Sequence, residues 1–318
     1  MNEKAAHVNI KREETKEFLI RNFVYIGLVL VLVLFEIMTQ GRLLQKRNLM
    51  NIFNNFFLIG LGASAFTFII AISELDLSTG AIVGISAALG ALAGKTNVAL
   101  VVPVCILTGL IAGSLNGFMI SKLKMASFIA TLASSYVLKG LTTYLLDGSV
   151  GVDISIRVFD QNWIKITTLI AAVIIFYILF EHCAVGKRSR AVGASAEAAR
   201  QSGVHVEFIR FMPYLMIGLM CGIVGAFSLA RSCTATTSTG SGFEFDILLA
   251  VLFGGMPLTG GWSVKYRSAI LGSVTMAVLK SGMSLCGITG TAQQIVRGAL
   301  LIIIVAITFD RKVVAAIK

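Results

Sequence analysis

The chain has 318 residues, of which 56% are hydrophobic and 14% are charged, and its formal net charge is +11. A soluble domain usually carries about a quarter charged residues, so this composition excludes a soluble enzyme, an intrinsically disordered protein and a disulfide scaffold. At roughly 20 apolar residues per membrane-spanning helix, there is room for about ten spans. Long continuous apolar runs such as residues 26–35 favour helices over a barrel. The sequence therefore predicts an all-α polytopic membrane protein.

The predicted elements begin with a polar tail, residues 1–17, and end with a second tail, residues 310–318. Between them, residues 18–309 form one predicted transmembrane domain. No small-residue cleavage site follows the first apolar run, so we expect an uncleaved span. The ten predicted spans are, in chain order, Phe18–Met38, Ile52–Ile72, Ala81–Ala93, Val98–Ile120, Ser127–Leu146, Ile164–Phe180, Phe211–Ala230, Phe245–Thr259, Ser268–Leu285 and Ala292–Phe309. The third and the eighth are too short to cross a bilayer, which indicates broken helices buried in protein.

Ten spans place both termini on one side of the membrane, and the distribution of Lys and Arg indicates which side. Of the 27 basic residues, 17 fall in the tails and loops of one face and seven on the other, while Lys139, Lys280 and Arg297 fall within spans. Cytoplasmic loops carry the excess of Lys and Arg, so both termini are predicted in the cytoplasm. The cluster Arg42–Arg47 departs from this rule without an evident reason. The net charge is thus a topology signal, and no nucleic-acid partner is expected.

Small residues recur at four-residue spacing in several spans. The repeats are Gly80/Gly84/Ala88, Gly90/Gly94, Gly109/Gly113/Gly117 and Gly218/Gly222/Ala226. Residues four apart share one face of a helix, so these faces let two helix backbones approach closely. We expect them to pack helices, and a role along a solute path is the alternative. No repeat of fixed period is visible.

Motifs of nucleotide binding and catalysis are missing from the sequence. There is no GxxxxGKS or GxxxxGKT loop for ATP, no HExxH and no GxSxG. The five cysteines contain no CxxC pair and the three histidines lie far apart, so no metal site is predicted. Acidic residues in apolar surroundings are therefore the next candidates.

Two pairs of acidic residues lie beside predicted helix breaks. Glu74 and Asp76 occupy a turn, and Asp76 is placed to cap the following helix, where a carboxylate is favoured. Glu244 and Asp246 follow a run of Thr, Ser and Gly, and the same interpretation applies to them. A proton or ion relay is the alternative for the first pair, and the role of Glu74 is open.

Other polar residues lie inside predicted spans. Each could hydrogen-bond between helices, or could line a path for a polyhydroxylated solute. They are Asn116, Thr131, Ser134, Ser135 and Tyr136.

The segment 181–210 is the only sizeable polar segment between predicted spans, and we expect it in the cytoplasm. Within it, Ser195 is a predicted N-cap, Glu197 suits the first turn, and Gly203 is a predicted stop. A helix of about two turns is marginal alone and gains stability by docking. The segment is therefore either a docking lever for another protein or a connector packed on its own membrane domain.

At these residues the sequence resembles the membrane permease subunits of ribose-type ABC sugar importers. The matching motifs run in the family's order from about residue 49 to 309. The chain departs from the family pattern at Glu74, at Ala126-Ser127 and at Lys265–Arg267. The three main motifs are Leu75–Gly80, Glu197–Gly203, and Gly242–Asp246 with Gly254–Gly261.

The resemblance implies a division of labour in a bacterial inner membrane. Two permease chains, identical or related, form the pathway in the lipid, and cytoplasmic ATPase subunits bind ATP and Mg²⁺, so this chain binds no cofactor. An extracytoplasmic binding protein delivers a sugar or sugar-like solute. The coupling residues implied are Ser195, Glu197, Ala198, Ala199, Arg200 and Gly203. The implied path residues are Asp76, Asn116, Phe128 and Thr131, and the implied structural turns are Gly80, Glu244, Asp246, Gly254 and Gly255.

Three other functions compete with this interpretation. Broken helices and intramembrane acids also suit an ion-coupled secondary transporter, although acids are scarce. An ABC importer for a nucleoside or an amino acid is a second alternative. An intramembrane enzyme is the third, but the sequence offers no paired nucleophile and base.

Overall fold

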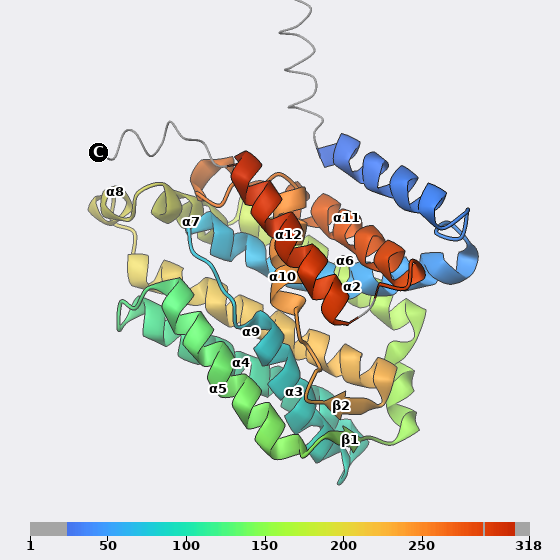
Figure 1. The fold of residues 1–318 in the computed structure, drawn as a ribbon. Coiled ribbons are helices and arrows are strands. Elements are labelled where there is room, and N and C mark those ends of the chain that lie inside the picture. The colour runs from blue at the N-terminus through green and yellow to red at the C-terminus, as the bar shows by residue number, and fades with distance from the viewer. Residues whose placement is uncertain (1–23, 289, 309–318) are drawn as a thin grey trace, which may run out of the picture.

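The computed structural model describes residues 24–288 and 290–308, which form a bundle that is mostly helical (Figure 1). Both predicted tails lie outside these residues. After a helix at Val24–Met38, the α-helices are α2 (Lys46–Ala71), α3 (Thr79–Gly94), α4 (Val101–Ser121), α5 (Ser127–Leu146), α6 (Asn162–Tyr177), α7 (Ala184–Ala194), α8 (Ala196–Gln201), α9 (Val206–Ser232), α10 (Phe243–Phe253), α11 (Tyr266–Leu285) and α12 (Thr291–Thr308). Shorter turns are the 3-10 helices η1 (Val98–Leu100), η2 (Ile154–Asp160) and η4 (Gly261–Ser263), and the π-helix η3 (Ile178–His182).

Each of the ten predicted spans overlaps one of these helices, although α10 ends at Phe253, six residues before the predicted end of its span at Thr259. The two helices predicted to be broken are short, with 16 residues in α3 and 11 in α10. Five helical segments are long and apolar enough to cross a membrane: α2, Val98–Ser121, Asn162–His182, α9 and α11. Helix α5 has 20 residues but carries Ser, Thr, Tyr and Lys139 side chains that lower its hydropathy. The chain is therefore an integral membrane protein of the helical class.

A small sheet corrects the all-α prediction. Strand β1 (Ser149–Gly151) pairs with β2 (Thr234–Thr236) in antiparallel register, with Val150 opposite Ala235. Both of these central side chains are buried. Three residues per strand are too few to produce a visible alternation of polar and apolar residues, so the sheet could not be predicted from the sequence. It joins the segments that follow α5 and α9 at one end of the bundle (Figure 1).

Helices α4 and α9 make the most extensive contact in the described part of the chain. Their glycines meet directly and in antiparallel order. A Cβ atom on Gly109 would lie 2.7 Å from the nitrogen of Gly222, and one on Gly113 would lie 2.8 Å from the Cα of Gly218. Both distances are shorter than real contacts, so only glycine permits this approach. The packing role predicted for the four-residue glycine spacing is confirmed for these two helices.

The packing contains a repeat that the sequence did not show. Helices α2, α3, α4 and α5 correspond to α9, α10, α11 and α12. Contacts of α4 with α9, α3 with α9, α3 with α4 and α3 with α5 recur as α11 with α2, α10 with α2, α10 with α11 and α10 with α12. The short helix is second in each half. Short or broken helices at corresponding positions of two repeats are the usual indication of a solute site in a transporter.

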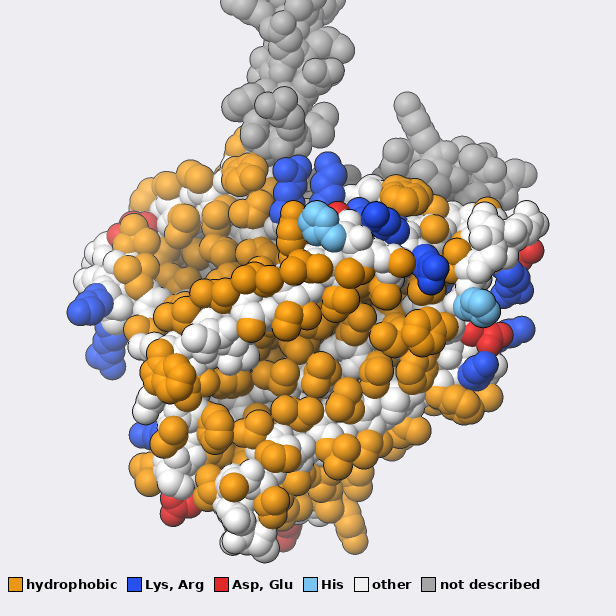
Figure 2. Space-filling view, turned by 180° about the vertical axis from the view of Figure 1, so that it is seen from behind, with side chains coloured by type: hydrophobic (Ala, Val, Ile, Leu, Met, Phe, Trp, Pro, Cys, Tyr) orange, Lys and Arg blue, Asp and Glu red, His pale blue; other side chains and the backbone are white. Residues whose placement is uncertain are grey.

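The surface of the bundle is largely hydrophobic. Figure 2 shows, on the side opposite to Figure 1, a broad apolar band with Lys, Arg, His and acidic side chains gathered towards its margins. Large apolar side chains exposed there and elsewhere include Leu107, Ile111, Ile170 and Ile174. Such a surface suits contact with lipid tails, whereas a water-soluble monomer rarely exposes apolar patches of this extent.

Candidate translocation pathway and coupling loop

The break between α2 and α3 is built by hydrogen bonds around Asp76. Its carboxylate is buried, and Oδ1 accepts the Ser78 backbone N–H at 2.7 Å as well as the Ser78 hydroxyl. Asn116 on α4 donates from Nδ2 to Ser78 Oγ at 2.7 Å. Asp76 thus folds the turn just ahead of α3, two residues before the N-cap position, which Ser78 occupies. Asp76 Oδ2 and Asn116 Oδ1 have no hydrogen-bond partner among the described residues.

Thr131 reaches the same turn from α5. Its Oγ1 accepts the Leu77 N–H at 3.2 Å and donates to the Ser127 carbonyl at 2.8 Å. The structure therefore brings three of the four implied path residues together, Asp76, Asn116 and Thr131, and their contacts shape the break. Phe128 is not part of this group, because its side chain is 49% exposed on the outside of α5.

The second break lies between β2 and α10, where residues 237–242 cross the first turns of α3. Gly240 and Gly242 have φ angles of +79° and +78°, which favour glycine. A Cβ atom on Gly84 would lie 2.8 Å from the Thr239 carbonyl oxygen, and one on Gly80 would overlap both the Gly240 carbonyl and the Glu244 carboxylate. Close backbone contact thus places the beginnings of the two short helices side by side.

The two acids of α10 form ion pairs with the three basic residues that the sequence places within spans. Glu244 Oε1 lies 3.1 Å from Lys139 Nζ of α5. Asp246 Oδ2 lies 2.7 Å from Lys280 Nζ of α11, and its Oδ1 lies 3.0 Å from Arg297 Nε of α12. Glu244, Asp246 and Arg297 are buried. Since charges in a bilayer are stable only when paired, these ion pairs fix α10 to three other helices.

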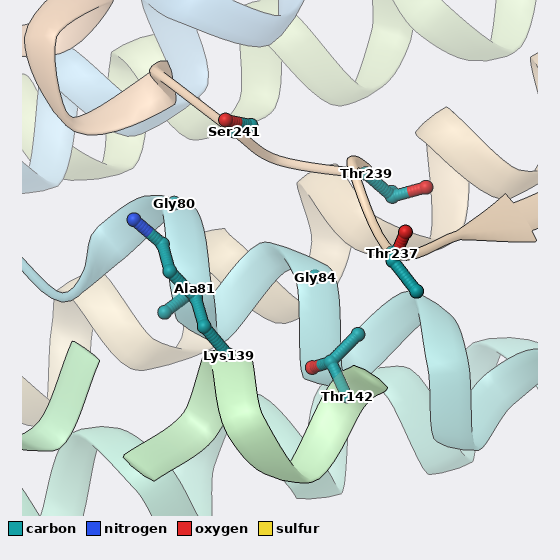
Figure 3. Close-up of a pocket in the computed structure, with 8 residues that line it drawn as sticks. All are labelled: Gly80, Ala81, Gly84, Lys139, Thr142, Thr237, Thr239 and Ser241. Atoms are coloured by element: carbon teal, nitrogen blue, oxygen red, sulfur yellow. The ribbon is translucent and has the colours of Figure 1, made fainter. Parts of the chain in front are cut away.

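A cavity of about 110 Å³ opens where α3, α5 and the 237–242 segment meet (Figure 3). None of the four implied path residues lines it. Lys139 and Thr142 contribute from α5, and hydroxyl side chains contribute from the segment that leads to α10. The lining residues are Gly80, Ala81, Gly84, Lys139, Thr142, Thr237, Thr239 and Ser241.

Glu74, whose role the sequence left open, ties the first break to α9. Its Oε2 accepts the Tyr214 hydroxyl at 2.7 Å, and its Oε1 lies 3.3 Å from Arg210 Nε. Helix α9 begins at Val206, five residues before the predicted span at Phe211, so Arg210 lies within the helix. No group of three His, Cys, Asp or Glu side chains comes together in the described ranges in a way that could hold a metal ion.

The predicted coupling segment folds into α7 and α8. Ser195 is the N-cap of α8 and accepts the Ala198 N–H at 3.3 Å, which confirms the predicted cap. Glu197, Ala198 and Arg200 are exposed, whereas Ala199 is buried against the rest of the chain. Gly203, at φ +80°, follows the helix. The helix therefore presents one charged face outward from the end of the bundle opposite to β1 and β2 (Figure 1).

The side chain of Ser73, in the first helix break, contacts both α7 and the turn that follows α10. Ser73 lies in the left-handed region at φ +61°, and its hydroxyl is 2.9 Å from the Gly193 carbonyl of α7 and 2.6 Å from the Thr259 carbonyl after α10. A serine hydroxyl has one proton, so it donates fully to one carbonyl at a time. In addition, Arg190 Nη1 of α7 lies 3.1 Å from Glu181 Oε2 of η3. The coupling segment is thus attached to the membrane helices at defined points.

The remaining predicted turn residues lie where α10 ends. Gly255 has φ +77°, and a Cβ atom on Gly254 would overlap the backbone of Ser268 at the start of α11. Sequence reasoning did not identify Ser73 or Tyr214 as contact residues. It noted Lys139, Lys280 and Arg297 within spans without pairing them, although three intramembrane cations and a nearby pair of acids were a usable signal.

The chain is similar in sequence to known sugar import permeases. The chain is 31% identical to the ribose import permease protein of Bacillus subtilis over 91% of this chain and 92% of that protein. It is 26% identical to the ribose import permease protein of Escherichia coli K12, over 96% and 98% of the two chains. It is 30% identical to the L-arabinose transport system permease protein of the same strain, over 79% of each chain.

No solved structure matched the chain. A family match, in contrast, extends over residues 48–305 and includes both helix breaks and the coupling segment. The chain therefore belongs to the permease family described as branched-chain amino acid transport system / permease component.

Proposed function

We propose that this chain is the permease subunit of an ABC importer that moves a sugar or sugar-like solute into the cell. The similarity to ribose and arabinose import permeases over most of each chain carries the proposal. The family description supports a second candidate, an importer of branched-chain amino acids. A secondary transporter driven by an ion gradient is not favoured, because the relatives are import permeases.

The proposed topology has ten spans in a bacterial inner membrane, with both termini in the cytoplasm. The helices that coincide with the ten apolar stretches support it, as does the excess of Lys and Arg on one face. Helix α9 has 27 residues, so it separates α8 from the β1–β2 sheet by about 40 Å at 1.5 Å per residue. In this topology α8 lies in the cytoplasm and the sheet lies at the outer surface.

The proposed partners are two cytoplasmic ATPase subunits, a solute-binding protein outside the cell and a second permease chain. ATP and Mg²⁺ would be bound by the ATPase, since this sequence has no P-loop. Helix α8, with Ser195, Glu197, Ala198, Ala199, Arg200 and Gly203 at or beside it, would seat in a groove of the ATPase.

Alternating access would follow from a rigid-body movement of this segment. ATP-driven closure of the ATPase subunits would displace α7 and α8, and the Ser73 contacts would carry that displacement to the first helix break and to the turn after α10. This chain would itself perform no catalysis.

Reconstitution in proteoliposomes tests the proposal. The vesicles would contain this chain with its cognate ATPase, and the binding protein would be added outside with labelled ribose, arabinose or leucine. We expect uptake of a sugar that requires ATP and all components. Uptake of leucine instead would favour the second candidate. Uptake driven by a proton gradient with this chain alone would contradict both.

A further inference from the structure

The cavity in Figure 3 lies at the point where the two short helices of the repeated halves meet. Gly80, Ala81 and Gly84 belong to the first turns of α3, while Thr237, Thr239 and Ser241 precede α10. Discontinuous helices create solute sites because their ends leave polar backbone groups unpaired inside the protein. The position of the cavity is therefore one where a translocated solute would meet polar groups within the bundle.

Its walls offer hydroxyl groups with free hydrogen-bonding capacity. No intramolecular hydrogen bond involves the side chains of Thr237 or Ser241 within the described parts of the chain. Thr142 Oγ1 donates to the Leu138 carbonyl at 2.8 Å, so its lone pairs remain available as acceptors. Such groups match a solute whose hydroxyls both donate and accept.

The charged groups at the cavity cancel each other. Lys139 uses one N–H toward Glu244 Oε1 at 3.1 Å and can donate two more. Glu244 is 5% exposed, and its second oxygen, Oε2, has no hydrogen-bond partner. That oxygen adjoins Gly80 in the cavity wall, because a Cβ atom on Gly80 would overlap it. Lys139 thus offers ammonium donors to the cavity, while Glu244, which lies behind Gly80 and does not line the cavity, balances the charge of Lys139.

We propose that this cavity is a transient subsite for the hydroxyl-bearing edge of a neutral sugar. The inference rests on the proposed function and extends it to named residues. A cavity needs only about 10–15 Å³ to hold one water molecule, so a volume of about 110 Å³ has room for adjacent hydroxyls on one side of a ring. A solute with a carboxylate or phosphate would compete for Lys139 and leave Glu244 buried without its partner, which is unfavourable.

Two matched substitutions on α5 test the subsite. Thr142→Val removes a hydroxyl that lines the cavity, whereas Thr143→Val removes an exposed neighbour with the same kind of backbone bond, 3.0 Å to the Lys139 carbonyl. Uptake of D-ribose and L-arabinose would be measured in proteoliposomes with the ATPase and saturating binding protein. One lost hydrogen bond is equivalent to roughly tenfold. We expect Thr142→Val to slow maximal uptake about tenfold and Thr143→Val to change it less than twofold.

A second measurement reports occupancy directly. The rate at which a maleimide modifies a Ser241→Cys variant would be followed by mass spectrometry of the peptide containing position 241, in the assembled complex with and without the transported sugar. We expect the sugar, but not leucine, to slow modification. Equal uptake by the two threonine variants, together with modification that the sugar does not slow, would overturn the subsite alone. A wild-type complex that takes up neither sugar would overturn the proposed function and the subsite with it.

Discussion

Neutralising Asp246 should destabilise the protein strongly, because that carboxylate holds two cations inside the bundle. Its side chain is 1% exposed, and those of Arg297 and Lys280 are 6% and 29% exposed. Asp246→Asn would leave both cations without their acid, at 2.7 and 3.0 Å from a neutral amide. Removing one partner of a buried ion pair typically costs about 3–5 kcal/mol. Since Lys280 can partly reach solvent, we expect a loss near 3 kcal/mol.

The measurement is the free energy of unfolding of the purified chain in mixed detergent and SDS micelles. Glu207→Gln is the matched control, since Glu207 and Lys122 are also 2.7 Å apart but lie exposed at the surface. Exposed ion pairs contribute little, so its unfolding midpoint should not move. Adding Lys280→Met to Asp246→Asn removes one unpaired cation and should recover part of the loss. Equal stability of the Asp246 and Glu207 variants would refute this reasoning.

Three further predictions concern coupling and packing. In proteoliposomes, Ser73→Ala should raise the number of ATP molecules hydrolysed per solute transported several-fold. Ser263→Ala removes a hydrogen bond within one loop and should leave that ratio unchanged. Equal ratios in the two variants would contradict the role of Ser73. Gly113→Val should prevent α4 from reaching Gly218 and so abolish a monodisperse peak in size-exclusion chromatography, and a normal peak would contradict the packing. Ser195→Ala should weaken α8 by about 1 kcal/mol, seen as faster amide exchange over residues 196–201, and unchanged exchange would contradict the cap.

The helices were predictable because apolar runs and small-residue spacing are local signals. The limits of α5, residues 127–146, agree with the predicted span, and the N-cap at Ser195 follows from one residue type in one position. The motif around Asp76 likewise identified a helix break.

Long-range contacts were not predictable from one sequence. The partners of Asp246 lie 34 and 51 positions further along the chain, and Glu74 and Tyr214 are 140 positions apart. Only the fold brings such residues together. The repeat could not be predicted from the sequence either, because helix packing can be preserved with different side chains in the two halves.

The direct backbone contact between α4 and α9 has a mechanical consequence. At Gly109, Gly113, Gly218 and Gly222 no side chain separates the two helices, and closely packed protein is hardly compressible. A displacement of the Val206 end of α9 would therefore move α4 by nearly the same distance, because no flexible side chains lie between the two helices. The two helices should move as one rigid body during each transport cycle.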